Sequence, residues 1–237
     1  MLELVGFDGD DTLWRSQDFY DAAQLEFERI VGRYVDLADA RLHDRLLAIE
    51  ASNIHVFGYG AKGMTLSMIE AAFEITGGAI EAVDLHRLVG IGKDVLAHPV
   101  ELLPGIRAAV EQVAATHRIV LITKGDLLHQ QDKVARSQLG DLFHRIEIVS
   151  EKNPAAYARV LEECDVDAAA FAMVGNSLRS DIAPVVSLGG WGIYMPYHST
   201  WSLELDPEFA TDVPRVIQVD AASSIPSAVE SIARVLA

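Results

Sequence analysis

Four groups of polar residues in this 237-residue chain each follow a short apolar run. They contain carboxylates, a hydroxyl and an ammonium, which are groups that hold a divalent cation and neutralise an anionic ligand. In chain order the groups are Asp8, Asp10, Asp11 and Thr12; Thr123, Lys124 and Gly125; Glu151 and Lys152; and Gly175, Asn176, Ser177 and Asp181. Brought together, they would form an acidic metal-binding pocket that contains a hydroxyl and an ammonium.

The apolar runs alternate with helical patterns along most of the chain. The four runs before the polar groups and two later ones cover residues 2–7, 117–123, 145–150, 170–176, 190–195 and 216–219. Such alternation is typical of a parallel sheet, because each parallel connection needs a crossover. Ligands of these sheets bind beyond the carboxyl ends of the strands. We therefore expect an α/β fold, a Rossmann-like doubly wound parallel sheet whose strand ends gather the four polar groups.

Residues 16–97 interrupt this alternation with an all-helical pattern. The first helix in this region carries apolar residues spaced three or four apart, namely Phe19, Ala23, Phe27, Ile30 and Tyr34. Similar spacing predicts three more helices before Ala97, and no segment there resembles a strand. The chain is therefore expected to contain an α/β core formed by residues 1–15 and 98–237, with residues 16–97 inserted as a helical domain.

Composition and charge disfavour several classes of protein. A net charge of −16, from 35 acidic against 19 basic residues, disfavours nucleic acids and anionic membranes as partners. A single cysteine, Cys164, forms no intramolecular disulfide and suits a reducing compartment. The N-terminal residues lack the pattern of a signal peptide, and no apolar run approaches the roughly 20 residues that cross a bilayer. We therefore expect a cytoplasmic protein.

The four polar groups resemble, in order, the motifs of the haloacid dehalogenase superfamily. The segment FDGDDTLW at residues 7–14 fits the signature D-x-D-x-[TV]-L, and LITKGD, SEKNP and VGNSLRSDI follow it along the chain. The superfamily includes phosphatases, phosphomutases, phosphonatases and dehalogenases, and some members carry a helical cap inserted just after the first strand. The helical insertion lies at that point, so the resemblance covers the whole predicted core and accounts for its interruption.

The resemblance implies a phosphatase mechanism with four catalytic side chains. Asp8 would attack phosphorus and form an aspartyl-phosphate, and Asp10 would protonate the leaving alcohol and later activate water. Thr123 would bind a phosphoryl oxygen through its hydroxyl. Lys152 would orient Asp8 and balance the charge of the phosphoryl group.

The resemblance also implies Mg²⁺ as the cofactor. The cation would be held by the carboxylates of Asp8 and Asp181 and by the main-chain carbonyl of Asp10. Many superfamily members carry an acid where this chain has Asn176, whose amide oxygen would hold a metal-bound water. We therefore expect Asn176 to affect metal affinity.

Further substrate contacts are expected from two loops. The backbone N–H groups of Lys124 and Gly125 lie where a helix is expected to begin, which favours an anion. In the helical domain, the glycine-rich segment FGYGAKG at residues 57–63 places Tyr59 and Lys62 between two helices. From that position they would contact the leaving group of the substrate, although glycines there also suit an ordinary helix–helix connection.

Other functions remain open at this point. A 2-haloacid dehalogenase would use the first aspartate but would need neither a metal nor the second acid, and Asp10 argues against it. A phosphomutase would share the same core. A non-catalytic phosphate-binding regulatory module, such as a phospho-aspartate receiver, would accept phosphate after a later strand. The preferred prediction is a phosphatase for a small phosphorylated metabolite, with an apolar face of the helical domain available for a homodimer.

Overall fold

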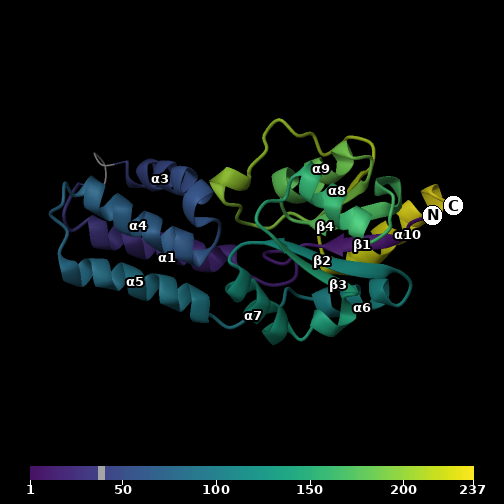
Figure 1. The fold of residues 1–237 in the computed structure, drawn as a ribbon, viewed down its shortest axis with the longest axis horizontal. Helices are drawn as coiled ribbons and strands as arrows, with labels where there is room; N and C mark the ends of the chain where they lie inside the picture. Colours follow the sequence, from purple (N-terminus) through teal and green to yellow (C-terminus); the bar gives the residue numbers. More distant parts are fainter. Residues whose placement is uncertain (37–40) are drawn as a thin grey trace. The chain divides into compact units, whose positions relative to one another are not determined.

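A computed structural model describes residues 1–36 and 41–237, and its centre is a six-stranded parallel sheet (Figure 1). The strands are β1 (Leu4–Phe7), β2 (Arg118–Lys124), β3 (Arg145–Val149), β4 (Phe171–Gly175), β5 (Trp191–Tyr194) and β6 (Val216–Gln218). Their order in the sheet is β3-β2-β1-β4-β5-β6, and every neighbouring pair is parallel. The predicted α/β fold is confirmed, and β1 lies in the interior of the sheet.

Helices cover both faces of this sheet (Figure 1). They are α6 (Ile106–Ala114), α7 (Leu127–Ser137), α8 (Pro154–Glu163), α9 (Ala183–Ser187) and α10 (Ile225–Val235). Successive strand residues point to opposite faces, so Val5 and Phe7 pack with apolar residues of α6 and α10. Leu4 packs on the other face with α8 and α9. Two apolar layers thus fix the strand that ends next to Asp8.

Contacts divide the chain into two compact units. The first contains the sheet and consists of Met1–Gln17, Val100–Lys124 and Gln130–Ala237, and the second consists of Asp18–Pro99 and Gly125–His129. The helices of the second unit are α1 (Gln17–Val31), α3 (Leu42–Phe57), α4 (Ala61–Ile75) and α5 (Ala82–Ala97). They pack around their own buried apolar cluster, and they correspond to the four helices predicted between residues 16 and 97.

Two segments near the strand ends differ from the predicted pattern. The helix expected after β4 begins with a π-type turn at Leu178–Ile182 and becomes the short α9 only afterwards. Between β5 and β6, a segment of mostly irregular structure contains a single 3₁₀ turn at Ser202–Glu204. Within the described part of the chain, no helix has the length and apolarity needed to cross a membrane.

Candidate active site

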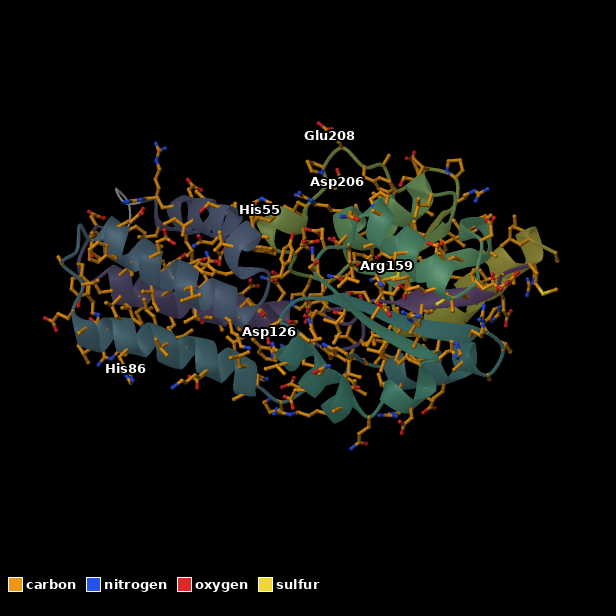
Figure 2. The ribbon with its side chains drawn as sticks, in the orientation of Figure 1. His55, His86, Asp126, Arg159, Asp206 and Glu208 are labelled. Carbon is orange, nitrogen blue, oxygen red and sulfur yellow. The ribbon has the colours of Figure 1, made fainter. Side chains whose placement is uncertain are left out.

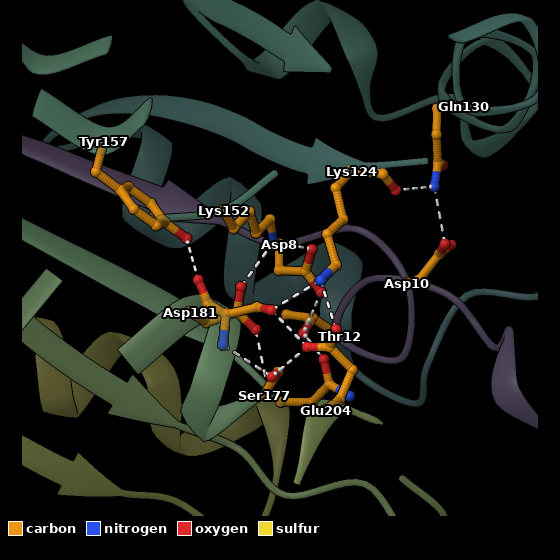
Figure 3. Close-up of polar contacts among 12 residues, drawn as sticks. Asp8, Asp10, Thr12, Lys124, Gln130, Lys152, Tyr157, Ser177, Asp181 and Glu204 are labelled. Atoms are coloured by element: carbon orange, nitrogen blue, oxygen red, sulfur yellow. Dashed lines mark hydrogen bonds and ion pairs between the residues drawn. The ribbon is translucent and has the colours of Figure 1, made fainter. Parts of the chain in front are cut away.

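The centre of the site is the buried ammonium of Lys152, which lies between the buried side chains of Asp8 and Asp181. Asp8 follows β1, Lys152 precedes α8, and Asp181 lies in the π-type turn. The Lys152 ammonium donates to Asp8 Oδ1 and also to Asp181 Oδ1, at 2.6 Å (Figure 3). The Lys152 side chain is only 2% exposed, so the three charges compensate one another in a medium where an unpaired charge is costly. Three of the predicted site residues therefore meet in space.

The pKa values of Asp8 and Lys152 are both raised in this group. Burial, with a further contribution from Asp181, raises the pKa of Asp8 to about 7, although the Lys152 ammonium opposes the shift. Burial also acts to lower the pKa of Lys152, but Asp181 and Asp8 hold it well above its usual value. One permanent ammonium thus faces two carboxyl groups. An additional cation would allow both carboxyl groups to stay ionised.

Oxygen donors suitable for Mg²⁺ lie beside this group. The side-chain amide of Asn176 lies 3.1 Å from the main-chain oxygen of Asp10 and 3.2 Å from Asp8 Oδ2. Adjacent oxygen ligands of an octahedral Mg²⁺ ion are about 3 Å apart, because each lies about 2.1 Å from the metal. The amide oxygen accepts from Thr12 Oγ1 at 3.3 Å and faces this position, where it would serve as a ligand; a half-turn of the amide would let its NH₂ group donate to the two oxygens instead. The residues therefore fit Mg²⁺.

The proposed magnesium position is not marked by a cluster of carboxylate, imidazole or thiol side chains. Among the described residues, no three His, Cys, Asp or Glu side chains are arranged to hold a metal together. The fit instead depends on the Asp8 carboxylate, the Asp10 main-chain oxygen and the Asn176 amide, to which the expected ligand Asp181 would add a second carboxylate. Such a mixed oxygen set is compatible with Mg²⁺, which keeps several of its waters when it binds to proteins.

The side chain of Asp10 points away from Asp8 and towards Gln130 (Figure 3), and three donors hold it. Trp14 Nε1 donates at 2.6 Å, Gln130 Nε2 at 2.8 Å and Lys133 Nζ at 2.7 Å. Burial acts to raise the pKa of Asp10, but Lys133 and the hydrogen bonds from Lys133, Gln130 and Trp14 keep it below its usual range. In this arrangement Asp10 is an ionised carboxylate, and it would have to leave these donors to protonate a leaving group.

The end of β2 supplies the predicted phosphate-binding residues. Thr123 is buried, and a Cβ atom on Gly9 would lie 3.1 Å from its hydroxyl, so Thr123 adjoins the backbone that follows Asp8. The Lys124 side chain extends to Ser180 Oγ at 2.9 Å and pairs with Glu204. Gly125 has a φ of 137°, which favours glycine. Phosphate binding by these residues stays a prediction.

The glycine-rich segment belongs to the second unit, within which Lys62 forms an ion pair. Its ammonium bonds both carboxylate oxygens of Asp126, at 3.0 and 2.9 Å. Tyr59 lies in the same connection between α3 and α4. Contacts of Tyr59 and Lys62 with a leaving group stay predictions.

Two residues of the first motif have local roles. The Asp11 carboxylate accepts the backbone N–H groups of Ser16, at 2.8 Å, and Gln17, at 3.0 Å, so it caps the turn before α1. Thr12 donates its hydroxyl to Asp8 Oδ2 at 3.3 Å. Thr12 thus contacts the carboxylate at the centre of the site.

Sequence reasoning did not single out several residues that surround the site. Four of them lie outside the quoted motifs, and Ser180 lies within the last motif but was not singled out. These residues are Gln130, Lys133, Tyr157, Ser180 and Glu204. Tyr157 is buried, and its hydroxyl donates to the main-chain oxygen of Ser180 at 2.9 Å.

Comparisons with known proteins agree with the geometry. A family model for haloacid dehalogenase-like hydrolases matches residues 2–189. A haloacid dehalogenase-like hydrolase of known structure from Xanthomonas campestris is 52% identical, with a TM-score of 0.87 over 98% of this chain and 91% of that chain. A 2-haloacid dehalogenase from Pseudomonas syringae shares the fold at 21% identity, with a TM-score of 0.60 over 98% of this chain and 99% of that chain.

One relative is named for its activity on a phosphorylated substrate. The glyceraldehyde 3-phosphate phosphatase of Pyrococcus abyssi is 28% identical over 101 residues. The match covers 40% of this chain and 42% of that protein, so it spans less than half of the relative.

Proposed function

We propose, from the premise that the chain belongs to the haloacid dehalogenase-like hydrolase family, that it is a phosphatase for a small phosphorylated metabolite. The observation that carries this proposal is the buried group of Asp8, Lys152 and Asp181, with oxygen donors for a cation beside it. The match to a phosphatase from Pyrococcus abyssi supports phosphoric monoesters as the substrate class.

In the proposed reaction, Asp8 attacks the phosphorus atom and the bond to the leaving alcohol breaks in line with it. Lys152 keeps Asp8 oriented and offsets negative charge on the phosphoryl oxygens. Thr123 donates its hydroxyl to one of these oxygens. Asp10, once released from its three donors, takes up a proton from solvent and gives it to the alcohol; the resulting carboxylate then removes a proton from the water that hydrolyses the aspartyl-phosphate.

The proposed metal ligands are the Asp8 carboxylate, the Asp10 main-chain oxygen, Asn176 and Asp181. When bound, Mg²⁺ supplies charge neutralisation between the nucleophile and the phosphoryl oxygens. The net negative charge of the chain does not prevent binding of an anionic substrate, because the local ammonium groups and the cation set the electrostatic potential inside the site. Together with the single cysteine, these features support a cytoplasmic enzyme with a small-molecule substrate.

Metal removal tests this function. Adding EDTA during a screen of phosphorylated metabolites is expected to slow hydrolysis by at least about 100-fold, because charge repulsion between Asp8 and the phosphoryl group returns. Excess Mg²⁺ is expected to restore the rate, whereas Na⁺ at the same ionic strength is not. Hydrolysis that continues unchanged in EDTA, in protein shown by elemental analysis to be metal-free, would contradict the metal assignment.

Removal of the proposed general acid is expected to depend on the leaving group. Asp10→Ala should slow hydrolysis of alkyl phosphates by about 10²- to 10⁴-fold, because an alkoxide leaves poorly without a proton. The same change should slow p-nitrophenyl phosphate much less, since its leaving group is already stable as an anion. Measuring kcat for both substrates checks this, and equal losses would count against the role of Asp10.

A 2-haloacid dehalogenase is the second candidate, and the Asn176 amide favours it. In the orientation that donates to Asp8 Oδ2 and to the Asp10 main-chain oxygen, the amide satisfies these oxygens without a metal. A dehalogenase would release halide from 2-chloropropionate in the presence of EDTA. Halide release under those conditions, with no phosphate release from any tested monoester, would replace the phosphatase proposal.

A further inference from the structure

The segment between β5 and β6 contains Glu204, whose carboxylate lies beside the site although the residue belongs to none of the four motifs. Long connections with little regular structure inside a folded unit are often functional. The segment contains the 3₁₀ turn Ser202–Glu204, and Arg179 Nη1 donates to the main-chain oxygen of Leu203 at 2.8 Å. Glu204 is thereby directed towards the turn that follows β4 (Figure 3).

The Glu204 carboxylate meets three donors. Ser177 Oγ donates to it at 2.8 Å, Ser180 Oγ donates to the same oxygen, and the Lys124 ammonium pairs with the other. Its side chain is 14% exposed, as is that of Lys124. Burying a carboxylate is unfavourable unless it is paired and hydrogen-bonded, and here both conditions hold. Burial acts to raise the pKa of Glu204, but Lys124 and the two hydroxyls keep it below its usual value.

The two serines that bond Glu204 also shape the π-type turn that carries Asp181. Ser180 N donates to Ser177 Oγ at 3.0 Å, and Ser177 N donates to Asp181 Oδ2 at 3.0 Å. Asp181 N in turn donates to the main-chain oxygen of Ser177 at 2.9 Å. Turns of the π type are rare and are often found at functional sites, and Glu204 bonds this one from outside its own backbone. Asp181 is thus hydrogen-bonded to Ser177 and follows Ser180 directly in the chain, and Glu204 holds both serines.

We propose that Glu204 is a positioning residue for the reaction: it fixes the Ser177–Asp181 turn and the Lys124 ammonium so that Asp181 meets Lys152 and Asp8. Its catalytic consequence rests on the proposed phosphatase function, whereas its hold on the turn does not. Glu204 bonds Ser177, Ser180 and Lys124 rather than Asp8 or Asp181, so it acts through these hydroxyls and this ammonium.

If Glu204 had a purely structural role, its loss would affect a different segment of the chain. It would anchor only the segment between β5 and β6, and its loss would loosen that segment while the turn after β4 stayed intact. Hydrogen exchange separates the two roles because it measures the protection of each segment by itself.

The test compares Glu204→Gln with Glu208→Gln. Both changes remove one negative charge from the same segment, and Glu208 is exposed and points away from the unit that contains the sheet (Figure 2). In Glu204→Gln, peptides that cover residues 176–183 are expected to exchange at least about fivefold faster than in the wild type. In Glu208→Gln these peptides are expected to exchange at the wild-type rate.

Turnover supplies the second measurement. For the best phosphomonoester of the screen, kcat of Glu204→Gln is expected to fall by about 10- to 100-fold with little change in KM, because the reacting groups are misplaced while binding persists. Glu208→Gln is expected to keep the wild-type kcat.

Each outcome decides the proposal. Faster exchange confined to residues 195–215, or an unchanged kcat, would overturn it. If no phosphomonoester is hydrolysed by the wild type, the phosphatase proposal fails by itself, and the exchange rates still show whether Glu204 holds the turn.

Discussion

Asp8→Asn is expected to lower kcat by at least about 10⁴-fold, the largest effect of any single change in this site. The amide keeps the size and shape of the carboxylate, and it still accepts a hydrogen bond from Lys152. It is, however, a very poor nucleophile towards phosphorus and forms no aspartyl-phosphate. The loss should therefore appear in kcat for every substrate rather than in substrate binding.

The measurement is steady-state hydrolysis with the best phosphomonoester, together with mass spectrometry of the purified variant. Mass spectrometry is needed because the variant contains an Asn-Gly pair, which deamidates readily and would restore Asp8. Asp11→Asn is the matched control. It makes the same chemical change three residues away at a capping carboxylate, and it should keep kcat within about threefold because an amide oxygen still caps. More than about 1% residual activity in undeamidated Asp8→Asn would exclude the nucleophile assignment.

Lys152→Met is expected to destabilise the fold by about 3–5 kcal/mol, because it leaves two buried carboxyl groups without their cation. Asp8 and Asp181 would then either stay ionised beside each other or take up protons, and both options are unfavourable relative to the native ion pairs. Turnover should fall as well, by about 10²- to 10³-fold, since the charge on the phosphoryl group is no longer balanced.

Urea unfolding measures the stability change, and Lys62→Met is its control. Lys62 also pairs with a carboxylate, but its side chain is 50% exposed, so its loss should cost at most about 1 kcal/mol. A loss below about 1 kcal/mol for Lys152→Met, with an unchanged dependence on urea, would show that the buried pairs contribute little to stability.

The fold was predictable because its signals are local and repeated. Each strand is a short apolar run, and the polar motif after each run lies at the carboxyl end of that strand. Since parallel strands place these ends at one edge of the sheet, the order of the motifs alone predicted that Asp8, Lys152 and Asp181 would meet. The C-terminal helix α10 was not predicted, although Ile225, Val229 and Ile232 already carry its helical spacing.

The surroundings of the site were less predictable for a physical reason. The direction of the Asp10 side chain is a choice among rotamers, and it is decided by Gln130 and Lys133 on a helix that carries no motif. Glu204 lies 27 residues after Ser177 in the chain, in a segment without periodicity. Such contacts depend on the path of an irregular segment in space, and neither residue spacing nor composition predicts that path.

The interior position of β1 determines where this molecule tolerates redesign. Its backbone is locked on both sides by β2 and β4, and a side chain added at Gly6 would lie 2.7 Å from Phe171 and 2.8 Å from Met173. The backbone next to the Asp8 carboxylate is therefore held in one place by the sheet. Laboratory evolution towards new substrates should leave this strand untouched and diversify the segments that reach the carboxylate from elsewhere.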